Sequence, residues 1–340
     1  MTKAPTDGPG TALVTGSAGF IGYWLSRRLL DEGWRVVGID SFNDYYDPAL
    51  KERRAARLEG AGHSLLRGKV EAPGLLAEAF ATHRPDLVFH LAGQAGVRHS
   101  LTDPRAYLEA NLVGVFELLE AARAHPPRHL LMASTSSAYG ANEAMPYGET
   151  DRADHQMSFY AATKKAGENM AHSYAHLYGI PVTMFRFFTV YGPWGRPDMA
   201  LFKFTRAILG GEPIDVYNHG RMRRDFTYVE DLVEAVRRLA SAVPVRGAPV
   251  GEADSLSPVA PFRVVNVGNS RPVELSRFVA AIEAATGREA RRNLMPIQPG
   301  DVPATWADVR LLSALTGYVP GTAVEDGVAR FVDWYRAEMA

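Results

Sequence analysis

The chain has 340 residues, 46% of them hydrophobic, and its 37 basic and 38 acidic residues give a formal net charge of −1. A chain of this size can bury a large core in one large or two unequal domains, and its balanced charge excludes a strongly basic surface for nucleic acid or anionic lipid. Because it has no cysteine, disulfides, thiolate metal ligands and cysteine nucleophiles are also excluded. Residues 1–10 contain no apolar run of signal-peptide length, so we expect a soluble, cytoplasmic protein.

The first motif follows a short, β-prone apolar run at residues 11–15. It is the glycine-rich turn Gly16-Ser-Ala-Gly19-Phe20-Ile21-Gly22. A helical pattern follows the turn, and this order forms a phosphate cradle because glycines allow close approach and the helix N-terminus faces the anion. A second strand pattern ends at Asp40, whose carboxylate can accept from both adenosine ribose hydroxyls and repel a 2′-phosphate. The pattern predicts an NAD site, with a simple turn role as the alternative for Asp40.

Strand and helix patterns then alternate along the first half of the chain. They fall at residues 63–67, 74–82, 86–90, 104–124 and 129–134. This order is typical of an α/β fold with a doubly wound parallel (Rossmann) sheet, in which ligands lie at the carboxyl ends of the strands. Residues 90–98 and 134–140 fall at such ends. Thr135 follows a buried strand, so its hydroxyl can face a ligand, whereas the hydroxyl of Ser134 can equally satisfy a turn.

A long helix is predicted over residues 158–178, and it carries Tyr160 and Lys164. Residues four apart share one helical face, so the Lys164 ammonium can lie near the Tyr160 hydroxyl and lower a pKa that starts near about 10. A tyrosinate held in this way is a base for an alcohol proton. The spacing also arises by chance, and the alternative is a surface tyrosine beside a solvated lysine.

Taken together, these motifs resemble the extended short-chain dehydrogenase/reductase family. The resemblance rests on the glycine turn, Asp40, Asn111, Thr135 and the Tyr160-x-x-x-Lys164 pair. Longer stretches are similar to the UDP-glucuronate 4-epimerases of that family, namely residues 90–98, 160–165, 186–200 and 213–217. One departure is Lys69, where the family usually has an aspartate near the adenine amino group.

The resemblance implies roles for particular residues. NAD binding is assigned to Gly16, Gly19, Phe20, Ile21, Gly22, Asp40, Val70, Leu91, Ala92, Gln94, Asn111, Ser134, Tyr160, Lys164 and Phe187. Catalysis is assigned to Tyr160, Lys164 and Thr135, without a metal. Binding of the UDP-sugar is assigned to Arg98, Thr135, Ser136, Ser137, Thr189, Arg196, Val216, Tyr217, Arg224 and Asp301.

The reaction implied is a C4 epimerisation through a 4-keto sugar, with NAD reduced and reoxidised in each turnover. Related dehydratases and decarboxylases carry acidic residues directly after the threonine, whereas this chain has Ser136 and Ser137. Hydroxyls and the guanidinium of Arg196 suit a substrate carboxylate, which favours UDP-glucuronate and UDP-galacturonate as the pair interconverted. A solvated loop arginine before a helix cap at Asp198 is the alternative for Arg196. A UDP-glucose/UDP-galactose 4-epimerase, a UDP-glucuronate decarboxylase and a cofactor-sensing binding protein are the other functions considered.

The second half of the chain breaks the repeating pattern. We expect an NAD-binding domain at 10–187 plus about 224–265, and a UDP-sugar-binding domain at 188–223 plus about 266–337. The smaller domain should contain a helix at residues 199–209 and a strand at 214–217, and residues 245–261 read as a mobile surface loop. The resemblance also implies a homodimer that pairs the helices at 104–124 and 158–178.

Overall fold

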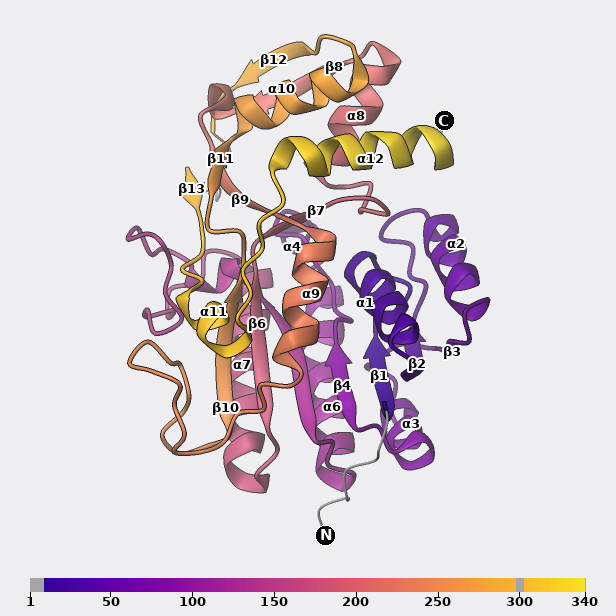
Figure 1. Cartoon of the computed structure of the whole chain (residues 1–340), viewed down its shortest axis with the longest axis vertical. Helices are drawn as coiled ribbons and strands as arrows, with labels where there is room; N and C mark the ends of the chain where they lie inside the picture. The colour runs from indigo at the N-terminus through magenta and orange to yellow at the C-terminus, as the bar shows by residue number, and fades with distance from the viewer. Residues whose placement is uncertain (1–8, 298–302, 340) are drawn as a thin grey trace.

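A seven-stranded sheet forms the centre of the protein in the computed structural model, which describes residues 9–297 and 303–339 (Figure 1). Its strand order is β10-β6-β5-β4-β1-β2-β3, and every neighbouring pair is parallel. The strands are β1 (Thr11–Thr15), β2 (Arg35–Asp40), β3 (Ser64–Arg67), β4 (Leu87–His90), β5 (His129–Thr135), β6 (Val182–Phe187) and β10 (Phe262–Val267). The predicted doubly wound parallel sheet is confirmed.

Helices cover both faces of this sheet. Side chains alternate along each strand, so Val14 enters one core and Leu13 the other. The first core is covered by α1 (Phe20–Asp31), α9 (Val229–Leu239) and α11 (Arg310–Thr316). The second is covered by α3 (Leu75–His83), α6 (Gly114–Ala124) and α7 (Phe159–Tyr178). Among the described residues, no helix combines the length and apolar content needed to cross a membrane.

The helix predicted over residues 104–124 is interrupted. It consists of α5 (Pro104–Leu108), a π-helical turn η1 (Glu109–Val113) and then α6. The wider turn contains Asn111, whose side chain accepts from the main-chain nitrogen of Gln94 at 2.9 Å and donates to its carbonyl at 3.0 Å. A π turn inserted in this way re-aims a side chain, and such turns are frequent at functional sites.

Most of the remaining elements build a smaller body above the carboxyl ends of the strands in Figure 1. Its strands are β7 (Thr189–Tyr191), β8 (Pro213–Tyr217), β9 (Arg223–Tyr228), β11 (Pro272–Glu274), β12 (Arg291–Met295) and β13 (Ala304–Thr305). Its helices are α8 (Ala200–Gly210), α10 (Leu275–Thr286) and α12 (Val324–Glu338). The other elements are α2 (Pro48–Glu59), α4 (His99–Thr102), η2 (Ser136–Tyr139) and η3 (Asn218–Gly220). The predicted helix at 199–209 and strand at 214–217 are confirmed, and the domain boundaries stay predictions.

One buried carboxylate joins three segments of the smaller body. Asp225, in β9, is fully buried and accepts hydrogen bonds from the main-chain nitrogens of Asn269 at 2.7 Å, Ser270 at 2.9 Å and Ala307 at 3.1 Å. Two of these amides follow β10 and the third follows β13. Asp225 therefore fixes where the chain leaves the large sheet and enters the smaller one.

The segment at residues 245–261 differs from its prediction as a mobile loop. Asp254 forms a buried ion pair with Arg263 of β10, with oxygen-to-nitrogen distances of 2.8 and 2.9 Å. The Ser255 hydroxyl donates to the carbonyl of Val264 and accepts from its main-chain nitrogen. The second half of the segment is therefore held along the edge strand, because its polar side chains satisfy groups of β10.

Replacing Asp225 by alanine should destabilise the protein strongly. Three buried amides would lose their acceptor, and we expect the free energy of unfolding to fall by about 3 kcal/mol, measured by denaturant unfolding. The matched control is Asp215→Ala in β8, where the exposed carboxylate accepts from the Asn293 side chain, and a change within about 0.5 kcal/mol is expected. Equal losses in the two variants would contradict this role of Asp225.

Candidate active site

A cavity of about 680 Å³ lies at the carboxyl ends of the parallel strands, where the smaller body meets the sheet. Its walls come from the carboxyl ends of β1 to β6 and the turns that follow them, and from α7. The predicted residues that line it are Gly16, Gly19, Phe20, Ile21, Gly22, Asp40, Val70, Leu91, Ala92, Gln94, Ser134, Thr135, Tyr160, Lys164, Phe187 and Arg196. The fold therefore brings the glycine turn and the Tyr160–Lys164 pair to one hollow.

The glycine turn is closely packed and needs its glycines. Gly16 has φ +71°, and a Cβ there would lie 2.9 Å from the main-chain nitrogen of Ala92. A Cβ on Gly22 would lie 2.0 Å from the carbonyl oxygen of Gly16. Asp40 is buried and accepts from the main-chain nitrogen of Ala18, inside the turn, at 3.0 Å. This cradle fits a dinucleotide phosphate group. The Asp40 carboxylate, at the end of the neighbouring strand β2, is placed to accept from a ribose hydroxyl.

A buried arginine supports the same turn, and sequence reasoning missed it. Arg54 of α2 is fully buried and donates to the carbonyl of Ala18 at 3.0 Å, to the hydroxyl of Tyr46 at 2.8 Å and to the carbonyl of Trp194. Burial lowers the pKa of Arg54. It ties the glycine turn to the 192–195 segment. Nothing in the sequence distinguishes it from the other basic residues of α2, because its burial depends on how α2 packs.

Where the cavity borders the turn after β3, Lys69 stands beside Val70 and Glu71, and all three line the wall. The Lys69 ammonium lies 4.0 Å from a carboxylate oxygen of Glu71 and is largely exposed. A lysine can only donate, so it cannot accept from an adenine amino group as the aspartate of the family would. Glu71 is the nearby group that offers acceptor oxygens.

Tyr160 and Lys164 lie near the start of α7, which begins at Phe159. The Ser158 hydroxyl caps this helix by accepting from the main-chain nitrogen of Ala161 at 3.1 Å. The Tyr160 ring packs edge-on against Tyr107, with centroids 5.9 Å apart. The predicted helix is thus confirmed, and a cap and a ring contact hold its first turn, which carries Tyr160.

The pKa values around the pair differ from the simple expectation. Burial raises the pKa of Tyr160 above its ordinary value, and the Thr135 hydroxyl and the Arg196 charge oppose that rise. Burial also lowers the pKa of Lys164 to about 8, against the opposing effect of Glu168. The predicted lowering of the Tyr160 pKa is therefore not found in the protein alone, because burial outweighs the favourable charges.

Arg196 lines the cavity in an ion pair. Its guanidinium donates to both carboxylate oxygens of Asp198, at 2.9 and 2.5 Å, and the Tyr45 hydroxyl donates to Asp198 at 3.1 Å. Burial would lower the pKa of Arg196, but Asp198 raises it above its ordinary value. The alternative of a solvated arginine before an Asp198 cap is wrong, because Met199 is the N-cap of α8 and Arg196 is mostly buried.

The predicted carboxylate contacts other than Thr135 lie apart from the main cavity that Arg196 lines. Ser136 and Ser137 form the start of η2, directly after Thr135, and are partly exposed. Thr189 starts β7 and borders a small hollow that Arg196 also lines. Neither serine, nor Thr189, is among the described residues that line the main cavity.

The predicted nucleotide contacts among the described residues are not part of the cavity lining. The guanidinium of Arg98 lies 5.2 Å from the ring centroid of Tyr217, so these two residues meet across the two parts of the molecule. Val216 is buried in the core of the smaller body, and Arg224 lies on β9 beside the buried Asp225. Asp301 lies outside the described residues.

Comparison with known proteins identifies the family. Residues 12–249 match the model of the NAD-dependent epimerase/dehydratase family. The chain belongs to this family. It is 57% identical over 327 residues to a probable UDP-glucuronate 4-epimerase of Rhizobium meliloti (strain 1021), covering 95% of this chain and 96% of the relative.

Solved structures of this family show the same architecture. A UDP-glucuronic acid 4-epimerase from Bacillus cereus, in complex with UDP-glucuronic acid and NAD, superposes with a TM-score of 0.86 at 30% identity, over 96% of this chain and 99% of that one. A UDP-glucose 4-epimerase from Thermotoga maritima, with UDP-glucose, gives a TM-score of 0.84 at 26% identity, over 97% and 100%. Overall shape therefore does not separate charged from neutral sugars.

Replacing Gly22 by alanine should abolish retention of NAD. The new Cβ would collide with the Gly16 carbonyl oxygen, so the turn must shift away from the position that admits a phosphate. We expect the bound nucleotide released by acid from the purified protein to fall at least about tenfold relative to the parent. Gly251→Ala, at an open position, is the control and should keep its nucleotide.

Proposed function

We propose that this protein is a UDP-glucuronate 4-epimerase that interconverts UDP-glucuronate and UDP-galacturonate with NAD bound. The observation that carries the proposal is that Tyr160, Lys164 and Thr135 share one cavity with the glycine turn and with Arg196. The identity with the Rhizobium meliloti relative supports the choice of substrate. A cofactor-sensing binding protein would not need this base beside an alcohol site.

In the proposed reaction, Tyr160 takes the proton from the sugar 4-hydroxyl and later returns it. Bound NAD supplies the acceptor for the C4 hydride, and the positive charge of its nicotinamide ring favours the ionised form of Tyr160. The charge of Arg196 acts in the same direction, and the Thr135 hydroxyl, which also favours the ionised tyrosine, orients the proton. Lys164, one helical turn away, would add its charge when it is protonated. The 4-keto sugar would turn over within the cavity and present its opposite face to the reduced cofactor, so that return of the hydride would invert C4.

The substrate carboxylate should be held by hydroxyls and one guanidinium. A 4-keto-uronate is a β-keto acid, and it loses carbon dioxide when its carboxyl bond stands perpendicular to the ketone plane. The proposed clamp consists of Thr135, Ser136, Ser137, Thr189 and Arg196, which would keep the carboxylate near that plane. Thr135 and Arg196 are the two of these residues that line the cavity. Arg196 already donates to Asp198, so the substrate carboxylate would either displace Asp198 from the guanidinium or bind beside it. A neutral sugar has no carboxylate to do so.

We further propose a cytoplasmic homodimer. The absence of cysteine suits a reducing compartment. The π turn and α6 expose Val113 and Phe116, and α7 exposes Phe159, Leu177 and Tyr178. Apolar side chains on these two neighbouring helices suit an isologous interface with a second copy.

The direct test is to incubate purified protein with UDP-glucuronate, without added NAD, and to follow the sugar proton signals by NMR. Retained NAD makes the expected product UDP-galacturonate, up to an equilibrium mixture. Tyr160→Phe is the control and should lower the rate by at least about a hundredfold. UDP-pentose as the main product, or turnover of UDP-glucose in place of the uronate, would contradict the proposal.

Weakening the carboxylate contacts should release carbon dioxide from the intermediate. In the double variant Ser137→Ala, Arg196→Ala we expect UDP-pentose beside the epimer, because the carboxylate can rotate out of the ketone plane, and kcat for epimerisation lower by about tenfold. Arg196→Lys, which keeps the charge, is the comparison and should form less pentose. Unchanged products in the double variant would count against the carboxylate clamp.

A further inference from the structure

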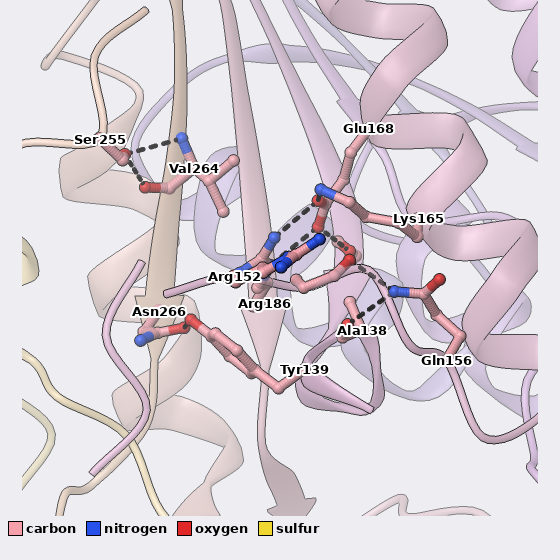
Figure 2. Close-up of polar contacts among 12 residues, drawn as sticks. Ala138, Tyr139, Arg152, Gln156, Lys165, Glu168, Arg186, Ser255, Val264 and Asn266 are labelled. Atoms are coloured by element: carbon pink, nitrogen blue, oxygen red, sulfur yellow. Dashed lines mark hydrogen bonds and ion pairs between the residues drawn. The ribbon is translucent and has the colours of Figure 1, made fainter. Parts of the chain in front are cut away.

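A buried carboxylate lies one helical turn beyond Lys164 on α7. Glu168 is only 2% exposed, and Figure 2 shows several polar groups converging on it. Arg186 of β6 donates to both of its oxygens, at 2.9 and 2.8 Å. The Ser134 hydroxyl donates to it at 2.6 Å and the Lys165 ammonium at 3.0 Å. Glu168 is therefore fully bonded as a carboxylate, and the catalytic steps proposed above do not use it.

The partner arginine contacts the other end of the same active-site segment. The guanidinium of Arg186 lies 4.5 Å from the ring centroid of Tyr139, the last residue of η2. The Tyr139 hydroxyl in turn donates to the side chain of Asn266 at 2.7 Å (Figure 2). Ser134 precedes Thr135 and Tyr139 ends the turn that follows it. The ion pair thus contacts the chain on both sides of Thr135.

Of the charges in this cluster, Glu168 is the one that acts on the pKa of Lys164. Burial would raise the pKa of Glu168, but bonding to Arg186 outweighs burial and lowers it to about 2, so the carboxylate stays ionised. Glu168 is also the charge that opposes the lowering of the Lys164 pKa by burial. Arg186 also acts on Glu149, where burial raises the pKa to about 7 and the Arg186 charge opposes that rise.

Other titratable groups near the pair do not supply this charge. His90, at the end of β4, is neutral because burial, together with the Lys164 charge, lowers its pKa to about 3. Tyr107 of α5 packs on Tyr160 and is kept neutral by burial, which raises its pKa. Arg196 acts on Tyr160 and carries the same sign as the lysine.

Stability alone gives a weak reason for such a pair. The desolvation of two buried charges offsets most of their attraction, and well-packed apolar residues often serve as well or better. This pair also bonds to the Ser134 hydroxyl, next to Thr135, and acts on the charge of Lys164, one turn from Tyr160. These contacts indicate a role in the active site.

We infer that Glu168 and Arg186 are positioning residues, whose ion pair fixes Thr135 against α7 and keeps the Lys164 ammonium charged beside Tyr160. The inference rests on the proposed function in one respect, because its kinetic test measures epimerisation of UDP-glucuronate. Neither residue touches the reacting atoms, and each acts through a neighbour.

Two single variants separate charge from position. Glu168→Gln keeps an acceptor for Ser134 but removes the negative charge, so the alkaline limb of the kcat–pH profile should move down by about one pH unit. Ser134→Ala keeps the charge but removes the link to β5, so kcat should fall by about tenfold without movement of that limb. Lys165→Met is the matched control, since it removes only the outer partner of the carboxylate, and it should leave the limb in place.

Because Glu168→Gln leaves Arg186 buried without its partner, the double variant Glu168→Leu, Arg186→Met is measured beside it. Removing both charges avoids an unpaired ion, and the same movement of the limb is expected. An unmoved limb in either folded charge variant, together with unchanged kcat in Ser134→Ala, would overturn the inference. Failure of both charge variants to fold would overturn it too, since the pair would then serve stability.

An assay without turnover keeps this inference distinct from the proposed function. The ionisation of Tyr160 is followed by ultraviolet difference titration of the NAD-loaded protein against its Tyr160→Phe variant. In Glu168→Gln, Lys164 loses its proton earlier, so Tyr160 should ionise at a pH higher by about one unit. If the parent protein fails to epimerise UDP-glucuronate while this shift is present, the proposed function fails and the inference stands.

Discussion

Parallel pairing of the seven strands is the constraint on which the rest of the structure depends. It places the carboxyl end of every strand at one edge, so the ends of β1 to β6 and the turns that follow them all border the same cavity. Residues as distant in sequence as Gly16 and Phe187 become neighbours of one ligand site. The smaller body then needs only to cover this edge, and it does so with the segment that carries Arg196.

Burial sets the chemistry of the cavity as strongly as the choice of residues. It raises the pKa of Tyr160 and lowers that of Lys164, so each member of the pair is pushed toward its neutral form. Fixed charges restore the balance. Glu168 favours the charged lysine from behind, Arg196 favours the ionised tyrosine from the cavity side, and a cationic nicotinamide would act in the same direction.

The protein uses paired charges at both ends of its catalytic segment. Glu168 with Arg186 is buried and fully bonded, whereas Arg196 with Asp198 is partly exposed and Arg196 lines the cavity. The buried pair of Glu168 and Arg186 suits a fixed position of the neighbouring chain. The pair of Arg196 and Asp198 is partly exposed, so Arg196 could accept another carboxylate as its partner. Both pairs combine an arginine with a carboxylate in the bidentate arrangement that favours a single orientation.

Local pattern determined much of this protein in advance. The alternation of strands and helices, the glycine turn before a helix, Asp40 at the end of β2 and the four-residue spacing of Tyr160 and Lys164 are all short-range features. The structure brings the turn, Asp40 and the pair to one cavity. Tertiary packing alone decided the π turn at Asn111 and the burial of Arg54. The pairing of Glu168 with β6 and the direction of the Tyr160 pKa also depended on it, because burial and long-range partners are properties of the folded chain that no window of sequence contains.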